Sequence, residues 1–344
     1  MSVSRRAATL GIGVTILIAL AIGVAFLKVP YVALGPGPTY NTLGTVDSTQ
    51  IIQVSGKPTS TSKGHLNLTT VSVANNLNLF EALRGWFDPD YAVVPRELVF
   101  PPNKSQQEVD AQNRADFQKS QSSAETAALR VLGYPVTVTV SKAAASVGDA
   151  VRPGDVVTQV DGNTVTSVDR LNTLLDKHKP GDKVQFTVVR GGQQVATTLT
   201  TLATKDADGN EHATVPVTFQ QQQPHPFKIT FKLANVEGPS AGLMFSLGLI
   251  DKLDPRDLTG GKFIAGTGTI DDDGNVGPIG GIQMKLIAAR RAGARYFLTP
   301  PDNCSEAKGA TPSGLRLVKS GTLNDALSAL ELIRAGNDSR LPRC

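Results

Sequence analysis

The sequence predicts an α+β fold that is preceded by an apolar N-terminal helix, and three observations support this prediction. An uncharged run extends from residue 7 to residue 27. Residues 136–204 hold several short strand-like segments and one short helical segment. From residue 228 to the end, strand-like and helix-like segments follow one another with glycine-rich turns between them. The chain is therefore expected to form an N-terminal helix and two folded units.

The composition is that of a globular chain with many turns. Glycine (33) and proline (21) are plentiful, and charged residues make up 19% of the 344 residues. The net charge is only +4, and the basic residues are scattered, with no basic stripe that includes aromatic residues. We therefore expect no nucleic-acid partner.

The first thirty residues predict where the chain resides. Arg5 and Arg6 precede the uncharged run Ala7–Leu27, and Lys28 follows it. As a helix this run is about 30 Å long, enough to cross a bilayer. A cleaved signal peptide is the alternative, but its apolar core usually has only about 7–15 residues. We expect residues 1–30 to be a single-pass transmembrane anchor of the cell membrane, with a cytoplasmic N-terminus and an extracytoplasmic remainder.

The chain between the anchor and residue 134 is predicted to hold a stem, a strand and two helices. Residues 31–63 are the predicted stem, which begins with a Gly-Pro-rich stretch. A strand is expected over His65–Val73, a short amphipathic helix over Leu79–Trp86, and a longer helix within Ser105–Leu132.

Residues 135–205 are predicted to form strands around one short helix. The strands are expected at Val136–Val140, Val151–Asn163, Val184–Arg190 and Gln194–Thr201, with the helix at Val168–His178. This order resembles the PDZ domain, with matching residues at Arg152–Val157, Val160–Gly162 and Lys179–Asp182. The resemblance implies that a protein or peptide substrate is captured, by its C-terminus, through strand addition in a groove. The usual carboxylate-binding loop is not evident in the short segment Lys142–Val147.

A polar linker is expected over residues 206–227, before a second α+β region over residues 228–344. The elements expected in that region are strands at Lys228–Leu233, Phe263–Ile270, Tyr296–Thr299 and Leu315–Val318, and helices at Ala241–Lys252, Met284–Ala292 and Leu323–Ile333. The acidic run Asp271–Gly274 resembles part of a calcium loop, but the required bidentate glutamate is missing downstream. We interpret it as a hairpin turn, and we expect no metal and no cofactor.

The chain has two cysteines, Cys304 and Cys344. Outside the cytoplasm they can form a disulfide that holds the C-terminal tail. Two unpaired thiols are the alternative, because the sequence does not give the distance between them.

Ser240 is the candidate nucleophile. It lies in Gly238–Gly242, a G-x-S-x-G pattern between a predicted strand and a predicted helix. Gly238 and Gly242 leave room for the hydroxyl to project and for a substrate backbone to approach. The helix N-terminus directs positive partial charge toward a developing oxyanion. A glycine-rich helix start with a capping serine is the alternative interpretation.

Lys285 is the candidate base. The four histidines all precede Ser240 in the chain, which excludes the Ser, acid, His order of an α/β-hydrolase. Lysine can act as a base if burial lowers its pKa, because desolvation disfavours the ammonium form. Lys285 follows glycines and has apolar neighbours on a predicted helix. A solvated surface lysine is the alternative.

Three motifs together resemble the proteolytic domain of the Lon family. They are Glu237–Gly242, Thr267–Gly268, and Pro278–Gly281 followed by Lys285. The separation of 45 residues (285 − 240) between serine and lysine suits the Ser-Lys dyad of that family. The resemblance implies that Ser240 is the nucleophile, that Lys285 is the general base, and that Thr267 orients the lysine. Glu237 matches an acidic position of the family.

The resemblance also implies an overall organisation. Residues 64–134 look like the early strand and first helix of the same proteolytic domain, so the PDZ-like region is expected to be inserted within it. No segment fits the nucleotide-binding pattern G-x-x-x-x-G-K-[ST]. The whole resembles the membrane-anchored, PDZ-containing Lon-like proteases of bacteria.

The function expected from this resemblance is an ATP-independent serine endopeptidase that cleaves extracytoplasmic peptides or unfolded proteins. The alternative is a PDZ scaffold, or peptide-binding protein, on an inactive peptidase fold. Homo-oligomerisation is suggested only by analogy with the rings that relatives form.

Overall fold

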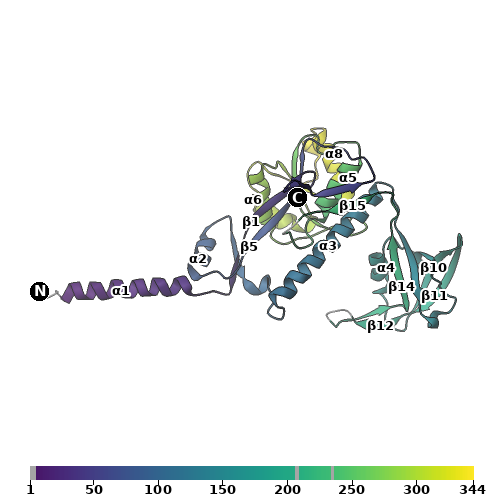
Figure 1. Ribbon diagram of the computed structural model, residues 1–344, viewed down its shortest axis with the longest axis horizontal. Helices are drawn as coiled ribbons and strands as arrows, with labels where there is room; N and C mark the ends of the chain where they lie inside the picture. Colours follow the sequence, from purple (N-terminus) through teal and green to yellow (C-terminus); the bar gives the residue numbers. More distant parts are fainter. Residues whose placement is uncertain (1–4, 206–208, 234–235) are drawn as a thin grey trace.

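The computed structural model describes residues 5–205, 209–233 and 236–344 (Figure 1). Residues 206–208, where the predicted linker begins, therefore lie outside the described residues. Helix α1 (Arg5–Phe26) extends away from the rest of the molecule. Within the described part of the chain, no helix combines the length and the apolarity needed to cross a bilayer, so the predicted transmembrane anchor is not supported.

The larger folded unit is built on a six-stranded sheet in the order β20-β19-β16-β5-β1-β6. The four strands β5, β16, β19 and β20 run parallel, whereas β1 and β6 are antiparallel to their neighbours. Their bounds are β1 Tyr31–Asn41, β5 His65–Ala74, β6 Ala92–Pro95, β16 Phe263–Gly266, β19 Tyr296–Thr299 and β20 Arg316–Lys319.

Residues 31–41, predicted as part of a stem, instead form the long strand β1 inside this sheet. β1 pairs with β5 on one side and with β6 on the other. Its glycines and prolines suggested an irregular segment because proline lacks the N–H that a strand donates. The sheet accommodates them at a register shift between Pro36 and Thr39. The Gly-Pro-rich composition therefore marks a bulge within a strand.

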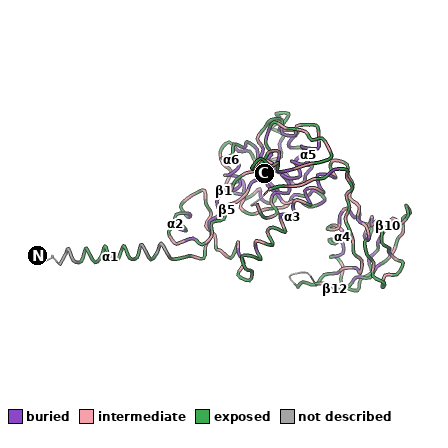
Figure 2. The backbone as a smooth tube through the Cα atoms, viewed as in Figure 1, coloured by how far each residue is buried: buried purple, intermediate pink, exposed green. Residues whose placement is uncertain are grey.

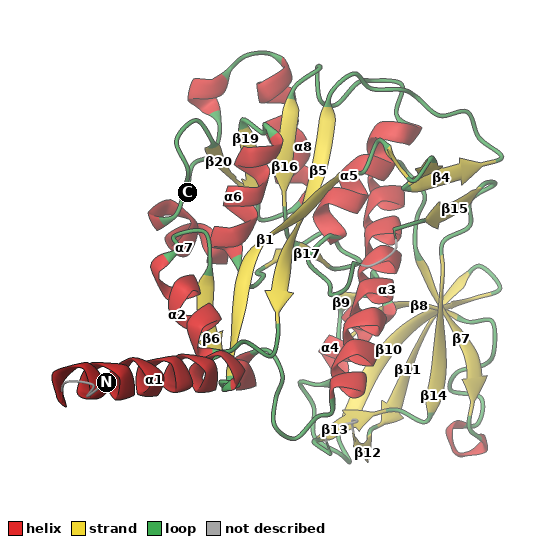
Figure 3. Ribbon diagram, turned by 60° about the vertical axis from the view of Figure 1, so that its left-hand side comes forward, coloured by secondary structure: helices red, strands yellow, loops and turns green. Residues whose placement is uncertain are grey.

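Helices cover both faces of this sheet. On one face α3 (Gln106–Val131), α5 (Gly242–Leu253) and α8 (Leu323–Arg334) enclose the largest apolar core. On the other face α6 (Ile282–Ala292) and α7 (Cys304–Gly309) pack over a smaller core. Figure 3 shows α3 and α5 side by side next to the sheet. Figure 2 shows the buried residues concentrated in this unit and in the second unit, whereas α1 is exposed.

The second unit contains a sheet in the order β11-β10-β8-β7-β14, with β9 paired to β8. The bounds are β7 Thr137–Ala143, β8 Val156–Val160, β9 Asn163–Thr164, β10 Lys183–Arg190, β11 Gln193–Thr200, β14 Val217–Gln222 and the helix α4 Val168–Leu175. The strands and the helix expected over residues 135–205 are thus present. Strand β14, however, lies in the span predicted as a linker and pairs with β7. A glutamine-rich stretch has a low intrinsic preference for strand, so β14 is stabilised as a strand by its pairing with β7.

The chain enters the second unit from α3 and returns through β15 (Lys228–Phe231), which pairs with β4 (Ile52–Ser55) of the larger unit. Strands that precede and follow the second unit in sequence therefore lie in the larger unit. Side chains also join the two units. Arg130 contacts Asp273 and the carbonyl of Thr166, and the Gln221 amide donates to Asp272 at 2.7 Å.

Two smaller predictions are confirmed. The run Asp271–Gly274 is the turn of a hairpin between β17 (Thr269–Ile270) and β18 (Val276–Gly277), and the Asp271 side chain accepts hydrogen bonds within the turn. Cys304 and Cys344 form a disulfide.

The remaining elements are α2 Leu79–Phe87, β2 Thr45–Val46, β3 Thr49–Gln50, β12 Leu202–Lys205, β13 Glu211–Thr214 and the short 3₁₀ turns Arg96–Leu98, Ala145–Val147, Pro301–Asn303 and Asp338–Arg340.

Gly37 is predicted to be essential for the close crossing of β1 and β5. A Cβ atom on Gly37 would lie 2.8 Å from the backbone carbon and oxygen of Thr70, and a strand backbone has little freedom to retreat. Gly37→Ala should lower the free energy of unfolding by about 2 kcal/mol in urea denaturation. Gly44→Ala is the control, because its nearest contact would be 3.4 Å. Equal stability of the two variants would contradict this account.

Candidate active site

Ser240 lies in a tight turn just before helix α5. Gly238 has φ +84°, a conformation that favours glycine over residues with a side chain. Its N–H donates to the carbonyl of Asn113 at 3.0 Å. The Ser120 hydroxyl, on α3, donates to the carbonyl of Pro239 at 2.9 Å. The turn is thus fixed against α3 by two hydrogen bonds.

Gly242, at the start of α5, is required because its surroundings are full. A Cβ atom there would lie 2.7 Å from the Ile270 side chain and 3.0 Å from the Ser120 hydroxyl. Gly238 and Gly242 are therefore each required by the backbone, but for different reasons. Gly238 supplies a positive φ, and Gly242 allows α5 to approach the β17–β18 hairpin closely.

Lys285 points from the first turns of α6 toward Ser240. Its Nζ lies 2.7 Å from Ser240 Oγ, 3.1 Å from Thr267 Oγ1 and 3.0 Å from the carbonyl oxygen of Thr69. Gly281, the N-cap residue of α6, has φ +68°, and a Cβ atom there would lie 2.9 Å from the Val71 side chain of β5. The predicted nucleophile and base are therefore in direct contact, although 45 residues separate them in sequence.

The amine of Lys285 is almost completely removed from water, since only 3% of the residue is exposed. Burial lowers its pKa from the ordinary 10.5 to about 7, because the charged form loses its hydration. A large fraction of the amine is thus neutral near pH 7. The alternative of a solvated surface lysine is excluded by this burial.

Thr267 connects the lysine to the backbone of the serine. It follows β16 directly and is fully buried. Its hydroxyl accepts from Lys285 Nζ and donates to the carbonyl of Ser240 at 3.0 Å. The N–H of Gly268 donates to the same carbonyl at 3.0 Å. Two donors from one loop therefore hold Ser240 while the threonine also contacts the lysine.

An open cavity of about 800 Å³ gives solvent and substrate access to Ser240. It is lined by the end of β5 (Thr69–Val73), by the turn that carries Ser240, and by Lys285. Glu237 also lines it but forms a half-exposed ion pair with Arg114 at 3.6 Å, and no contact joins it to Ser240 or Lys285 in the described part of the chain. No group of three metal-binding side chains gathers anywhere among the described residues.

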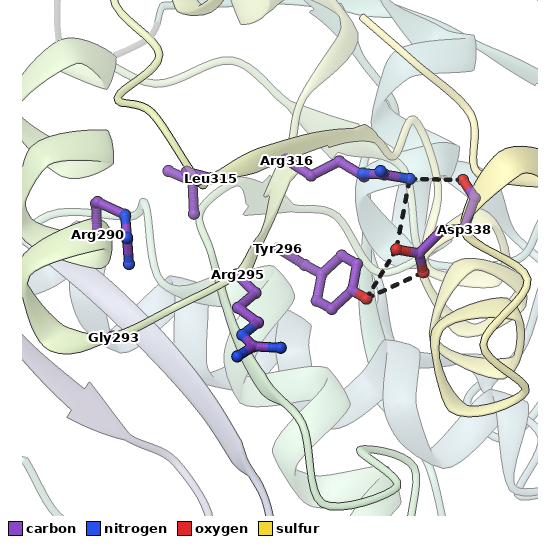
Figure 4. A pocket seen from close by; sticks show the side chains of 8 residues that line it. Arg290, Gly293, Arg295, Tyr296, Leu315, Arg316 and Asp338 are labelled. Atoms are coloured by element: carbon purple, nitrogen blue, oxygen red, sulfur yellow. Dashed lines mark hydrogen bonds and ion pairs between the residues drawn. The ribbon is translucent and has the colours of Figure 1, made fainter.

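A second cavity, of about 650 Å³, lies at the opposite ends of the parallel strands. Figure 4 shows Tyr296 and Arg316, the first residues of β19 and β20, directed toward Asp338. The Tyr296 hydroxyl donates to the Asp338 carboxylate at 3.0 Å. Ser240 and Lys285 instead lie by Thr69, in the middle of β5, and by Thr267, just after the carboxyl end of β16. The two cavities are therefore separate, and only the first contains the serine.

Sequence reasoning missed three groups that position the site. They are the carbonyl of Thr69, the carbonyl of Asn113 and the hydroxyl of Ser120. Backbone carbonyls carry no side-chain signal, so the first two were not visible in a single sequence. Ser120 lies in a serine-rich helix segment, which gave no reason to choose it over its neighbours.

Comparison with known protein families identifies two parts of the chain. Residues 228–322 match the Lon protease (S16) C-terminal proteolytic domain, and residues 114–201 match the PDZ domain. Among solved structures, the PDZ domain of an SdrC-like protein from Listeria innocua has 18% identity and a TM-score of 0.22. That alignment covers 26% of this chain and 99% of the other.

Similar proteins include several Lon proteases. The one from Roseiflexus castenholzii is 42% identical over 72 residues, which are 21% of this chain and 9% of that protein. The one from Azospirillum brasilense is 35% identical over 94 residues, or 26% and 11% of the two chains. This chain thus spans only about a tenth of the length of those relatives. Residues 228–322 are thus similar to the proteolytic domain of the Lon family, and residues 114–201 are similar to a PDZ domain.

Proposed function

We propose that this protein is an ATP-independent serine endopeptidase in which Ser240 is the nucleophile and Lys285 is the general base. One observation carries the proposal: the buried amine of Lys285 lies 2.7 Å from the Ser240 hydroxyl and has a pKa of about 7. A base with a pKa near the working pH is both available and strong enough to accept a proton. Independence from ATP is supported by the lack of a nucleotide-binding G-x-x-x-x-G-K-[ST] pattern in residues 1–344.

The three partners of Lys285 match the valences of a neutral amine. A neutral amine has two N–H groups and one lone pair. The Thr69 carbonyl can only accept, and Thr267 directs its own hydrogen to the Ser240 carbonyl, so both take an N–H from the amine. The lone pair is left for the hydrogen of the Ser240 hydroxyl. The arrangement therefore aims the basic electron pair at the nucleophile.

The reaction then follows from this geometry. Ser240 Oγ attacks the carbonyl carbon of the substrate while its proton passes to Lys285 Nζ. The negative charge that develops on the carbonyl oxygen lies near the N-terminus of α5, where backbone N–H groups and the helix dipole stabilise it. The lysine returns the proton to the leaving amine, and the peptide bond breaks to give an acyl-enzyme. Water, deprotonated by the same lysine, releases the second product.

We also propose that the substrates are peptides or loosely folded segments outside the cytoplasm, presented in part by the PDZ domain. The Cys304–Cys344 disulfide supports this location, because disulfides persist in oxidising compartments. The open cavity beside Ser240 supports access by an extended chain rather than by a folded domain.

Removal of either member of the pair should abolish hydrolysis of casein or of a peptide library. Ser240→Ala and Lys285→Met should each lower kcat by about 10⁴-fold, as for other catalytic residues that act as a unit. Lys252→Met is the matched control, because Lys252 is also buried and its pKa is also lowered by desolvation. No contact joins Lys252 to Ser240 among the described residues, so this variant should stay active if folded.

Two results would reject this mechanism. The first is substantial activity in Lys285→Met, which would require another base. The second is failure of a serine-reactive phosphonate to label Ser240 in the folded wild-type chain, which would favour the scaffold interpretation instead.

The pH dependence of kcat/KM should report the titration of Lys285. The neutral amine is the active form, so activity should be complete well above the pKa of about 7 and should fall tenfold for each pH unit below it. Steady-state rates between pH 5 and pH 11 measure this. A profile that rises only above pH 9 would show a lysine with an ordinary pKa.

The proposed location can be tested through the cysteines. In intact cells, Cys304 and Cys344 should resist thiol alkylation until a reductant is added, because they are bonded to each other. A membrane-impermeant alkylating reagent should then label both after mild reduction. Immediate labelling, or labelling only after cell lysis, would place the domain in a reducing compartment.

A further inference from the structure

Helix α2 presents large apolar side chains to solvent. Phe80 is 65% exposed, Trp86 is 56% exposed and Phe87 is 87% exposed. Phe80, Leu83 and Phe87 follow a spacing of three and four residues, which places them on one face of the helix. These four side chains, Phe80, Leu83, Trp86 and Phe87, are called the aromatic face below.

The aromatic face is not a displaced part of the core. Small residues, Ala82 and Gly85, form the buried side of α2 instead. A Cβ atom on Gly85 would lie 2.8 Å from the Val93 side chain, so the helix packs closely on β6. The helix is also fixed at its start by a capping box between Asn78 and Glu81. An ordinary surface helix buries its large apolar residues. Helix α2 instead exposes them to solvent, while its small residues pack against β6.

The aromatic face lies beside a second exposed apolar surface, on α1. The N–H of Leu79 donates to the carbonyl of Leu27, and the N–H of Val29 donates to the carbonyl of Leu77, so α2 is joined to the end of α1. Figure 1 shows α2 next to that end. The exposed apolar side chains of α1 and the segment after it include Leu10, Ile12, Ile16, Leu17, Leu20 and Leu27.

The exposure of residues along α1 indicates which kind of partner contacts α1 and the aromatic face of α2. Residues 9–20 are exposed on every side of the helix and carry no charge. A protein partner contacts one stripe of a helix, whereas lipid can surround it, so an all-round apolar helix suits a lipid environment. Aromatic side chains with nearby cations are typical of the layer where lipid meets water. Arg84 lies on α2 itself, and the Lys28 amine donates to the carbonyl of Asn76, just before α2.

We propose that the aromatic face of α2 is a lipid-contact surface that rests in the head-group layer of a phospholipid membrane. This contact would hold the larger unit at the membrane surface independently of its catalytic activity.

Strand β5 runs directly from Thr69, at the Lys285 amine, toward α2. The nine residue steps from Thr69 to Asn78 extend at most about 30 Å, so Ser240 would stay near the lipid.

The single tryptophan of the chain, Trp86, reports on this contact directly. We would mix the full chain with vesicles of phosphatidylcholine and phosphatidylglycerol and record Trp86 emission. The expected result is a blue shift and a loss of quenching by acrylamide in water. Lipids brominated near the glycerol should quench Trp86 more strongly than lipids brominated near the chain ends, because the proposed depth is shallow.

Matched variants separate the aromatic face from α1. The double variant Phe80→Ser/Phe87→Ser keeps Trp86 and the buried side of α2, so its circular dichroism should be unchanged. Its Trp86 blue shift and its quenching by brominated lipid should be lost, even if α1 still carries the chain to vesicles. Leu202→Ser changes a half-exposed leucine on the second unit and should behave like the wild type.

Two outcomes would overturn the proposal. In the first, vesicles bind the full chain but leave Trp86 emission and acrylamide quenching unchanged, so that α2 faces water. In the second, Trp86 emission shifts to the blue as protein concentration rises without any vesicles. That result would assign the aromatic face to a second copy of the chain.

Discussion

The proposed mechanism depends most on the burial of one amine, that of Lys285. Lys285 Nζ is removed from water, yet all three of its neighbours are oxygen atoms, two from hydroxyl groups and one from a backbone carbonyl. Burial disfavours the ammonium form and lowers the pKa to about 7. A carboxylate at the same place would favour the ammonium and remove the basic lone pair. The oxygen atoms instead orient the amine without adding a negative charge.

The fold provides this environment by bringing four segments together. Thr69 comes from β5, Thr267 from the loop after β16, Ser240 from the turn before α5, and Lys285 from α6. β5 and β16 are parallel neighbours, and the site lies at the edge of the sheet where β16 ends beside Leu68 of the longer β5, in keeping with the usual place for sites at the carboxyl ends of parallel strands. The second unit is connected through α3 and β15 and leaves this edge open.

The proposed nucleophile and base could be predicted from the sequence because three motifs together resemble the Lon proteolytic domain, whereas the neighbourhood of each residue alone left an alternative open. Ser240 lies between glycines, and Lys285 is a lone charge among apolar residues. Elements with strong periodicity, such as α5 and β5, were also predictable within about two residues. Strands β1 and β14 were not, because proline, glycine and glutamine are poor strand formers and pairing with neighbours decides their conformation. The Thr69 carbonyl was not predictable for a different reason, since every residue has one.

The most direct test of this account is the pKa of the Lys285 amine itself. Carbon-13 labelling of lysine side chains, with Lys285→Met to assign the signal, allows NMR titration of the Lys285 Cε resonance in the resting protein. We predict a midpoint near pH 7. A midpoint close to the ordinary value of 10.5 would mean that the amine is hydrated and charged at neutral pH, and the proposed base would then be wrong.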